Sequence, residues 1–199
     1  MPMKIRLALV LMLVNFISAC GGIPLHSIPK LIRLQSDLLV ADPAEFMLAI
    51  QTDERMTPPP DSPPKLILSI KPAESGAFQA IDKQLPMHFS IATSNKLGLP
   101  TPSAKRKWLI YSLTGESQKQ LTAIQTYFKN LQQQKLGGSL SVGIAQEGVA
   151  VKEPAFADSE WQSWLRLSQQ DGFFELWSGT IADLLKQAKA NEDANNSTQ

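Results

Sequence analysis

Cys20 is the only cysteine among the 199 residues, and it lies close to the N-terminus. No intramolecular disulfide can therefore hold the fold together, so a packed apolar core must stabilise it. About 160 patterned residues are enough for one domain that buries roughly two thirds of the surface of its unfolded chain. The sequence predicts a single globular domain at residues 31–190.

The residues before Cys20 have the composition of an export signal. Lys4 and Arg6 precede an apolar run from Leu7 to Phe16, and small residues follow that run. The run is too short to span a bilayer, which takes about 20 apolar residues. An ordinary secretory leader would leave Cys20 as a free thiol or an intermolecular crosslink in an oxidising compartment, whereas a chemical cap on the sulfur would remove that problem.

The segment Ile17-Ser18-Ala19-Cys20 resembles the lipobox of bacterial lipoprotein precursors. The resemblance implies cleavage between Ala19 and Cys20, a diacylglyceryl thioether on Cys20 and a third acyl chain, such as palmitate, on the new amino group. Gly21 stands where Asp would retain such a protein at the inner membrane. The implied location is thus the periplasmic face of the outer membrane, if the cell has one. Two or three acyl chains hold a protein on a bilayer almost irreversibly.

The expected order along the chain is a signal peptide at 1–19, an acylated tether at 20–30, the domain, and a disordered tail at 191–199. Cleavage removes two of the 19 basic residues and none of the 18 acidic ones, so the mature chain is close to neutral. Near-neutral charge without a Lys/Arg block gives no electrostatic case for nucleic acid. The expected partners are the membrane, reached through the lipid on Cys20, and a protein of the cell envelope.

Short apolar runs bounded by Pro, Gly, Asn and Asp predict strands. These runs are Glu45 to Thr52, Lys65 to Lys71, Pro86 to Thr93, Lys107 to Leu113 and Ser139 to Ala145. Residues 32–40 fit a strand or a helix. Thr57 to Pro64 is rich in proline and favours a stiff connection between strands, or else a docking segment.

A helical period runs from Glu116 to Gln134, with four apolar residues on one side. These are Leu121, Ile124, Phe128 and Leu131. Thr114 is expected to cap the start of the helix, and Gly137-Gly138 to end it. The helix between two strands predicts a βαβ crossover inside an otherwise antiparallel sheet. The fold class is therefore α+β, an antiparallel sheet or sandwich with one long amphipathic helix.

The C-terminal third predicts a hairpin, because Asp171-Gly172 is a strong turn signal between two alternating runs. The expected register puts Leu167 opposite Phe174, Arg166 opposite Glu175 and Trp164 opposite Trp177. One face is then apolar, and the other carries a candidate partner surface formed by Trp164, Arg166, Glu175 and Trp177. The alternative is that the last helix or Phe156 to Trp161 covers these rings as a second core. Thr180 and Asp183 predict the cap of that short terminal helix.

No pattern of residues points to a catalytic site, a cofactor or a metal. The glycines at 137, 138 and 143 follow a helix and lead into a strand, which is the reverse of a phosphate-binding loop. His26 and His88 have no ligand-spaced neighbours, and Ser112 and Ser117 lack a nucleophile-elbow motif.

The sequence favours a periplasm-facing lipoprotein that acts as a binding, accessory or scaffold subunit of an envelope assembly. Two other functions stay open. A carrier of lipid or another small apolar ligand would need an apolar cavity of at least ~300 Å³ between sheet and helix. An envelope hydrolase would need Ser, His or acidic side chains that converge in a cleft.

Overall fold

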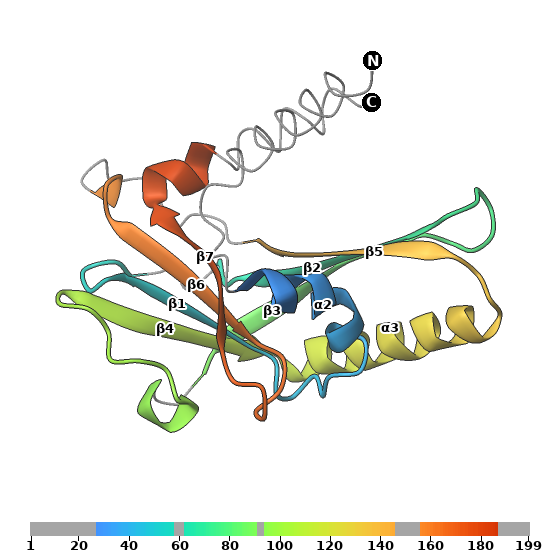
Figure 1. The fold of residues 1–199 in the computed structure, drawn as a ribbon, viewed down its shortest axis with the longest axis horizontal. Coiled ribbons are helices and arrows are strands. Elements are labelled where there is room, and N and C mark those ends of the chain that lie inside the picture. Colours follow the sequence, from blue (N-terminus) through green and yellow to red (C-terminus); the bar gives the residue numbers. More distant parts are fainter. Residues whose placement is uncertain (1–26, 58–61, 91–93, 146–155, 187–199) are drawn as a thin grey trace, which may run out of the picture.

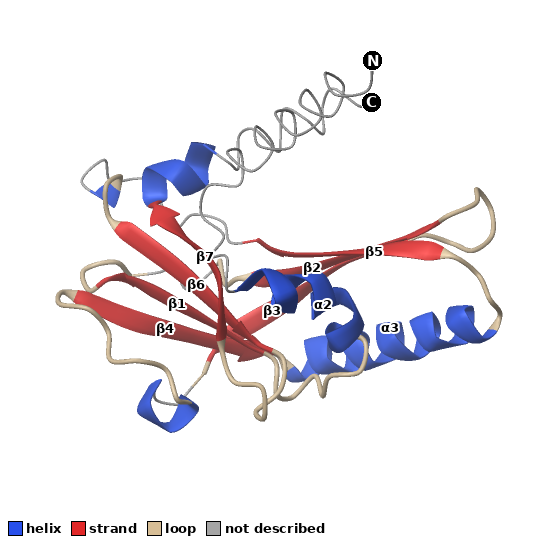
Figure 2. Ribbon diagram, viewed as in Figure 1, coloured by secondary structure: helices blue, strands red, loops and turns tan. Residues whose placement is uncertain are grey.

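The structure is a computed structural model that describes residues 27–57, 62–90, 94–145 and 156–186. Its described part is an α+β fold built on one seven-stranded antiparallel sheet with the strand order β5-β2-β3-β4-β1-β6-β7 (Figures 1 and 2). The α-helices are α2 (Ile28–Leu38), α3 (Gly115–Gln133) and a short helix at 181–186, and η2 (Ser94–Leu97) is a 3-10 helix. The strands are β1 (Met47–Asp53), β2 (Lys65–Pro72), β3 (Ile81–Phe89), β4 (Arg106–Leu113), β5 (Gly138–Ala145), β6 (Glu160–Arg166) and β7 (Phe174–Thr180).

β1 is the first strand among the described residues and lies inside the sheet, between β4 and β6. Six of its seven residues are buried, so both faces of the sheet are covered at this strand. Leu48 and Ile50 point into the main core, whereas Met47 and Ala49 point into a smaller cluster on the opposite face. An uninterrupted apolar run is typical of a strand that is buried on both faces.

The sheet curls where β3 changes partner. Residues 81–86 of β3 pair with β2, and Met87 to Phe89 pair with β4. Pro86 stands at this change, where the missing N–H of proline costs least. Its carbonyl oxygen accepts a hydrogen bond of 2.7 Å from the Ser117 hydroxyl, which ties the start of α3 to the bend.

α3 has the expected cap and the expected apolar side. The Thr114 side chain accepts a hydrogen bond from the Ser117 N–H. Leu121, Ile124 and Leu131 are buried, while Phe128 is only half-buried. The helix ends earlier than predicted, because Lys135, with φ of 58°, takes the left-handed position that was expected of the glycines.

The predicted βαβ crossover is wrong. β5 returns antiparallel to β2, and the antiparallel order across β3 and β4 makes β4 and β5 antiparallel as well. A βαβ unit needs two parallel strands. The helix must therefore bring the chain back to the edge of the sheet at which the first strand began. Here α3 runs along the long half of the sheet, and β5 makes the return at its outer edge (Figure 1).

The ambiguous segment is helical. Leu31, Leu34 and Leu38 of α2 pack against the main core, as residues three and four apart on one helix side do. α2 begins at Ile28, inside the segment expected as tether, with proline in its first turn. The proline-rich stretch joins β1 to β2, but its residues 58–61 lie outside the described part, as do residues 91–93 of the expected third strand.

The C-terminal hairpin forms in a different register from the predicted one. Leu165 lies opposite Phe174 and Trp164 lies opposite Glu175, but Ser163 lies opposite Trp177. Leu176 is thus an extra residue in β7, which makes a β-bulge. After the hairpin, Thr180 and Asp183 exchange backbone-to-side-chain hydrogen bonds of 3.1 Å in both directions, so the predicted capping box of the last helix is confirmed.

Candidate functional site

The clearest hollow in the described part lies between α2 and the loop that joins β6 to β7. It has a volume of about 430 Å³ and is open to solvent on one side. Leu167, Phe174 and Val40 form its apolar lining. Its rim carries five charged residues from both sides, namely Lys30, Arg33, Asp37, Asp42 and Asp171. We call this hollow the α2 pocket.

The first wall of the α2 pocket is held by packing and by one glutamine. The leucine side of α2 lies on the core, which turns Lys30, Arg33 and Asp37 toward the pocket. The Gln125 amide of α3 donates hydrogen bonds of 2.8 Å to the Leu38 carbonyl and 2.9 Å to the Ala41 carbonyl. The Leu38 carbonyl is the last of α2 and the Ala41 carbonyl follows in the next turn, so the glutamine fixes the chain where the helix ends.

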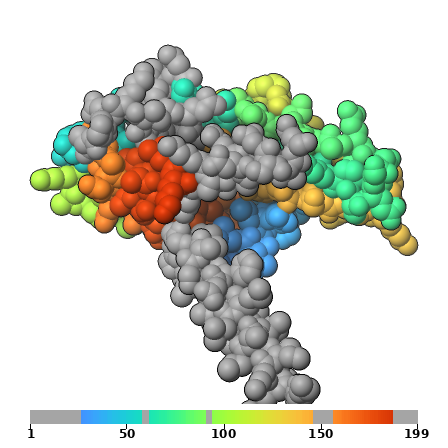
Figure 3. Space-filling view, turned by 90° about the horizontal axis from the view of Figure 1, so that it is seen from above, coloured from blue at the N-terminus to red at the C-terminus, as the bar shows by residue number. Residues whose placement is uncertain are grey.

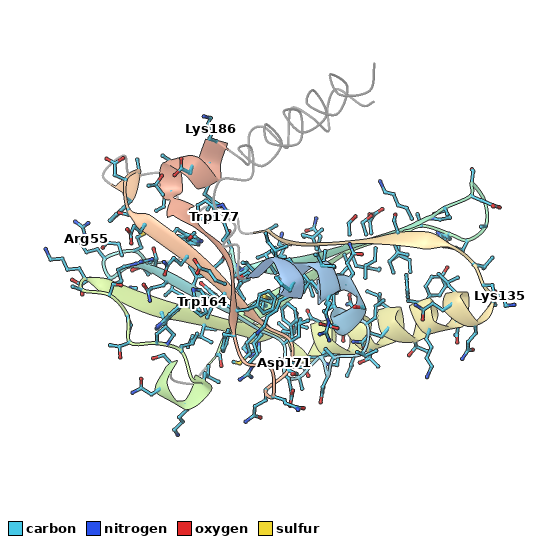
Figure 4. All side chains as sticks on the ribbon, in the orientation of Figure 1. Arg55, Lys135, Trp164, Asp171, Trp177 and Lys186 are labelled. Carbon is cyan, nitrogen blue, oxygen red and sulfur yellow. The ribbon has the colours of Figure 1, made fainter. Side chains whose placement is uncertain are left out.

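The second wall is the β6–β7 loop, in which Figure 4 labels Asp171. The Ser168 hydroxyl donates to the Asp171 carboxylate at 2.7 Å, and the Asp171 N–H donates back to the hydroxyl at 3.1 Å. The Gln169 N–H donates to the Glu45 carboxylate at 2.8 Å. Gly172 has a φ of 66°, which glycine adopts without strain.

The charges on the rim of the α2 pocket already have partners. Lys30 Nζ lies 3.3 Å from the Asp171 carbonyl oxygen and 5.3 Å from the centre of the Phe174 ring. Arg33 and Asp37 form an ion pair at 3.6 Å. Asp42 accepts a hydrogen bond of 2.9 Å from the Ala44 N–H. Exposed pairs of this kind contribute little free energy, so a ligand with polar groups could replace them at low cost.

The four residues of the predicted partner surface do not form one surface. The bulge at Leu176 turns Trp177 to the face of the main core, while Trp164 stays on the opposite face. Trp177 lies opposite Ser163, the neighbour of Trp164, so the two tryptophans labelled in Figure 4 are close along the hairpin but belong to different faces. The predicted pairing of Trp164 with Trp177 and of Arg166 with Glu175 is therefore wrong, because the loop is longer and β7 carries an extra residue.

Trp164 belongs to the small cluster on the outer face of the sheet. Its buried members are Met47, Ala49, Leu99 and Ile110. The Trp108 ring meets the Trp164 ring edge-on at 5.9 Å between centroids. A second core thus encloses Trp164, but Leu97 and Leu99 contribute to it, and neither the last helix nor Phe156 to Trp161 does, contrary to the expected alternative.

Arg166 is used inside the fold. Its guanidinium donates to the Glu45 carbonyl at 3.3 Å and to the Met47 sulfur at 2.8 Å, and it lies 5.4 Å from the centre of the Phe173 ring. Burial lowers the pKa of Arg166, and the charge of Glu45 opposes that shift. Arg166 therefore fixes the start of the β6–β7 loop.

A second hollow of about 310 Å³ lies at the other end of β6 and β7, next to the last helix. Its two carboxylates are engaged. Glu160 pairs with Arg106 at 2.9 Å, and Asp183 caps the helix. The hydrogen bonds from Thr180 lower the pKa of Asp183. This hollow brings together structural groups, so the α2 pocket is the better candidate site.

The remaining predicted residues lie apart from both hollows or outside the described ranges. Cys20, Ala19 and His26 fall outside them, and His88 is exposed on β3. Within residues 27–57, 62–90, 94–145 and 156–186, no three His, Cys, Asp or Glu side chains gather as a metal-binding group. In those same ranges no helix combines the length and apolar character needed to cross a membrane.

Comparisons with protein-family models, with curated proteins and with solved structures find no match for this chain.

Proposed function

We propose that the chain is a lipid-anchored, periplasm-facing lipoprotein that binds another component of the cell envelope as an accessory or scaffold subunit. The lipobox at Ile17-Ser18-Ala19-Cys20 carries this proposal. The described fold supports it, because α2 begins at Ile28, so the chain between Cys20 and the first helix spans at most about 28 Å. A domain on so short a tether works close to its membrane.

The α2 pocket is the place where we expect the partner to bind. It combines an apolar lining with five charged residues on its rim, all within one hollow. Such a mixture suits a segment of a protein, which brings one apolar side chain and polar backbone groups together. The pocket also lies next to the helix nearest to the anchor, so a neighbour in the same membrane can reach it.

A carrier of a small apolar ligand is the second candidate, and the volume of the α2 pocket favours it. About 430 Å³ exceeds the ~300 Å³ that such a carrier needs. The charged rim speaks against it, since pockets for apolar molecules bury most of the ligand among apolar side chains. Titration with a fluorescent fatty acid distinguishes the two, because saturable binding that Val40→Arg abolishes would favour the carrier.

The anchor is tested by metabolic labelling with a palmitate analogue in cells that make the full chain. The expected result is label in the wild type and none in Cys20→Ser, which should also leave the membrane fraction. A labelled, membrane-bound Cys20→Ser protein would refute the assignment of Cys20.

The binding role is tested with a photo-crosslinking amino acid at position 40 of the lipidated protein. Val40 is 84 % exposed and lines the α2 pocket, so the probe should leave the fold intact. The matched control places the same probe at Gln132, on the exposed side of α3. We expect a defined adduct from position 40 only. Identical adducts from both positions, or none from position 40, would refute the pocket as the partner site.

A further inference from the structure

The two edge strands of the sheet differ in how well they are protected. No described strand pairs with the outer edge of β5 or of β7. An open edge is a row of N–H and C=O groups that pairs with another extended backbone, and proteins block it with a charge, a proline or a bulge. β7 carries Glu175 and the bulge at Leu176. β5 reads Gly-Ser-Leu-Ser-Val-Gly-Ile-Ala and has none of these devices, so it is the edge that can accept a further strand.

The backbone groups of every second residue of β5 point to the open edge. The Ala73 N–H donates to the Gly137 carbonyl at 3.0 Å, one step beyond the paired residues Pro72 and Gly138. Hydrogen-bonded and non-hydrogen-bonded pairs alternate along an antiparallel ladder, so the odd-numbered residues of β5 bond to β2. The N–H and C=O groups of the even-numbered residues are therefore directed away from the sheet. These residues are Gly138, Leu140, Val142 and Ile144.

The side chains of β5 leave room for an added strand. The exposed residues on its outer face are small, namely Ser139, Ser141 and Gly143. On its inner face Leu140 is buried, and Val142 and Ile144 are half-buried against the main core. The space-filling view shows part of β5, in golden orange, at the surface near α2, in blue (Figure 3). An added strand would thus meet small residues on one face and cover apolar ones on the other.

β5 is complementary to itself. A two-fold axis at Ser141 places Leu140 opposite Val142 of a second copy. The same axis places Gly138 opposite Ile144 of that copy, so all four outward-directed residues have hydrogen-bonding partners. Apolar side chains then meet on the inner face, and serine or glycine meets serine on the outer face. Because the strand carries no charge, no like charges come to lie opposite each other.

We propose that two copies of this chain pair through β5, antiparallel and with the two-fold axis at Ser141. The two sheets then join into one continuous antiparallel sheet. Eight residues from each copy are fewer than the roughly 20–30 that each side of a standard interface contributes. The pairing is therefore weak in dilute solution and is favoured where the chains are concentrated, as on a membrane. No residue of β5 lines the α2 pocket, so the two contacts are separate.

A cysteine at the axis tests this geometry in membranes of cells that make the full chain. The two copies of position 141 form a non-hydrogen-bonded pair with Cα atoms about 4.5 Å apart, which suits a disulfide. The matched control is Ser139→Cys, because Ser139 is also exposed on the outer face of β5. In the proposed register Ser139 lies opposite Gly143 of the second copy. The two copies of position 139 are thus four residues apart, ~14 Å, which is too far for a disulfide.

After oxidation with copper phenanthroline, we expect Ser141→Cys to give several-fold more disulfide-linked dimer than Ser139→Cys on a non-reducing gel. The unchanged chain shows how much dimer forms through Cys20. Equal yields from the two variants, no dimer from Ser141→Cys, or a disulfide to a different protein would each overturn the proposal. Failure of palmitate labelling concerns Cys20 alone, so it is distinguishable from failure of this comparison.

A proline at position 142 gives a second test. The Val142 N–H points to the open edge, so proline there removes no hydrogen bond to β2 but blocks an added strand. Combined with Ser141→Cys, Val142→Pro should abolish the dimer while the purified variant keeps the circular dichroism spectrum of its parent. A dimer that persists with the proline would contradict pairing through β5. If the proline unfolds the domain, the two cysteine variants still decide, because both replace exposed serines.

Discussion

α2 and α3 pack on the same core but differ in the side that they turn outward. The outer side of α3 carries Glu, Lys, Gln, Asn and Thr, as a helix that faces water should. The outer side of α2 instead exposes Ile28 and Ile32. On their inner sides the two helices are alike, because leucine side chains of both pack against the core. The difference therefore lies in their outer sides: that of α3 is typical of a helix in water, whereas that of α2 leaves two isoleucines exposed.

The largest effect should come from the inner side of α3. Leu121 is 1 % exposed in the main core, so Leu121→Ala should lower the free energy of unfolding by about 2–5 kcal/mol. Phe128 is half-buried, so Phe128→Ala should cost less than the roughly 3–5 kcal/mol of a fully buried phenylalanine. Urea denaturation measures both. Gln132→Ala, on the exposed side of α3, is the control. An equal loss of stability in this variant would show that the apolar side of α3 does not contribute specially to the free energy of unfolding.

The link between the helices should come next. Gln125→Ala removes two hydrogen bonds and leaves the Leu38 and Ala41 carbonyls without that donor, which should cost about 1–3 kcal/mol. Hydrogen exchange should rise at the end of α2 more than within α3. Unchanged exchange in α2 would mean that its packing alone holds it, and the two helices would then be independent.

A smaller effect is expected at the start of α3. Thr114→Ala removes the acceptor of the Ser117 N–H and should cost about 1 kcal/mol, whereas Thr114→Ser should keep most of the stability. The thermal midpoints of the two variants decide this. Equal midpoints would show that the link between Ser117 and the Pro86 carbonyl, not the cap, fixes the helix start.

The smallest effect is expected on the outer side of α2. Ile32 is 76 % exposed, so Ile32→Ser should change the free energy of unfolding by no more than about 0.5 kcal/mol. The same urea titration measures it. A loss of 2 kcal/mol or more would show that another part of the chain covers this side, and the contrast with α3 would disappear.

Local signals predicted many of the elements well. The short apolar runs and the Pro, Gly, Asn and Asp residues that bound them located the strands near their true positions. β3 is an exception, because it begins at Ile81, before the predicted start at Pro86. The helical period located α3, and the residues at 114, 180 and 183 predicted both caps. These features depend on neighbours a few positions away, which is the range in which a sequence pattern is informative.

The hairpin register failed because distant residues decide it. The Arg166 side chain and the Gln169 N–H bind the carbonyl and the carboxylate of Glu45, which lies more than a hundred positions earlier in the chain. The loop is therefore longer than the turn signal suggested, and the bulge in β7 then turns Trp177 to the other face. No spacing within the hairpin contains that information.

The α2 pocket was missed for the same reason. Its walls come from Lys30 to Asp42 and from Leu167 to Phe174, which the fold alone brings together. The sequence did mark one member, Asp171, in the turn of the predicted hairpin. The convergence of the two walls depends on how α2 packs, and residues 32–40 fitted a strand equally well.

The place of β1 in the middle of the sheet has a consequence for how the chain folds. Its partners, β4 and β6, begin at Arg106 and Glu160, so the first strand to be made must wait for residues synthesised much later. Contacts of such long sequence separation are slow to form. A chain that emerges N-terminus first would thus hold an apolar strand open until most of its length has followed, and such a strand is prone to aggregation during that interval.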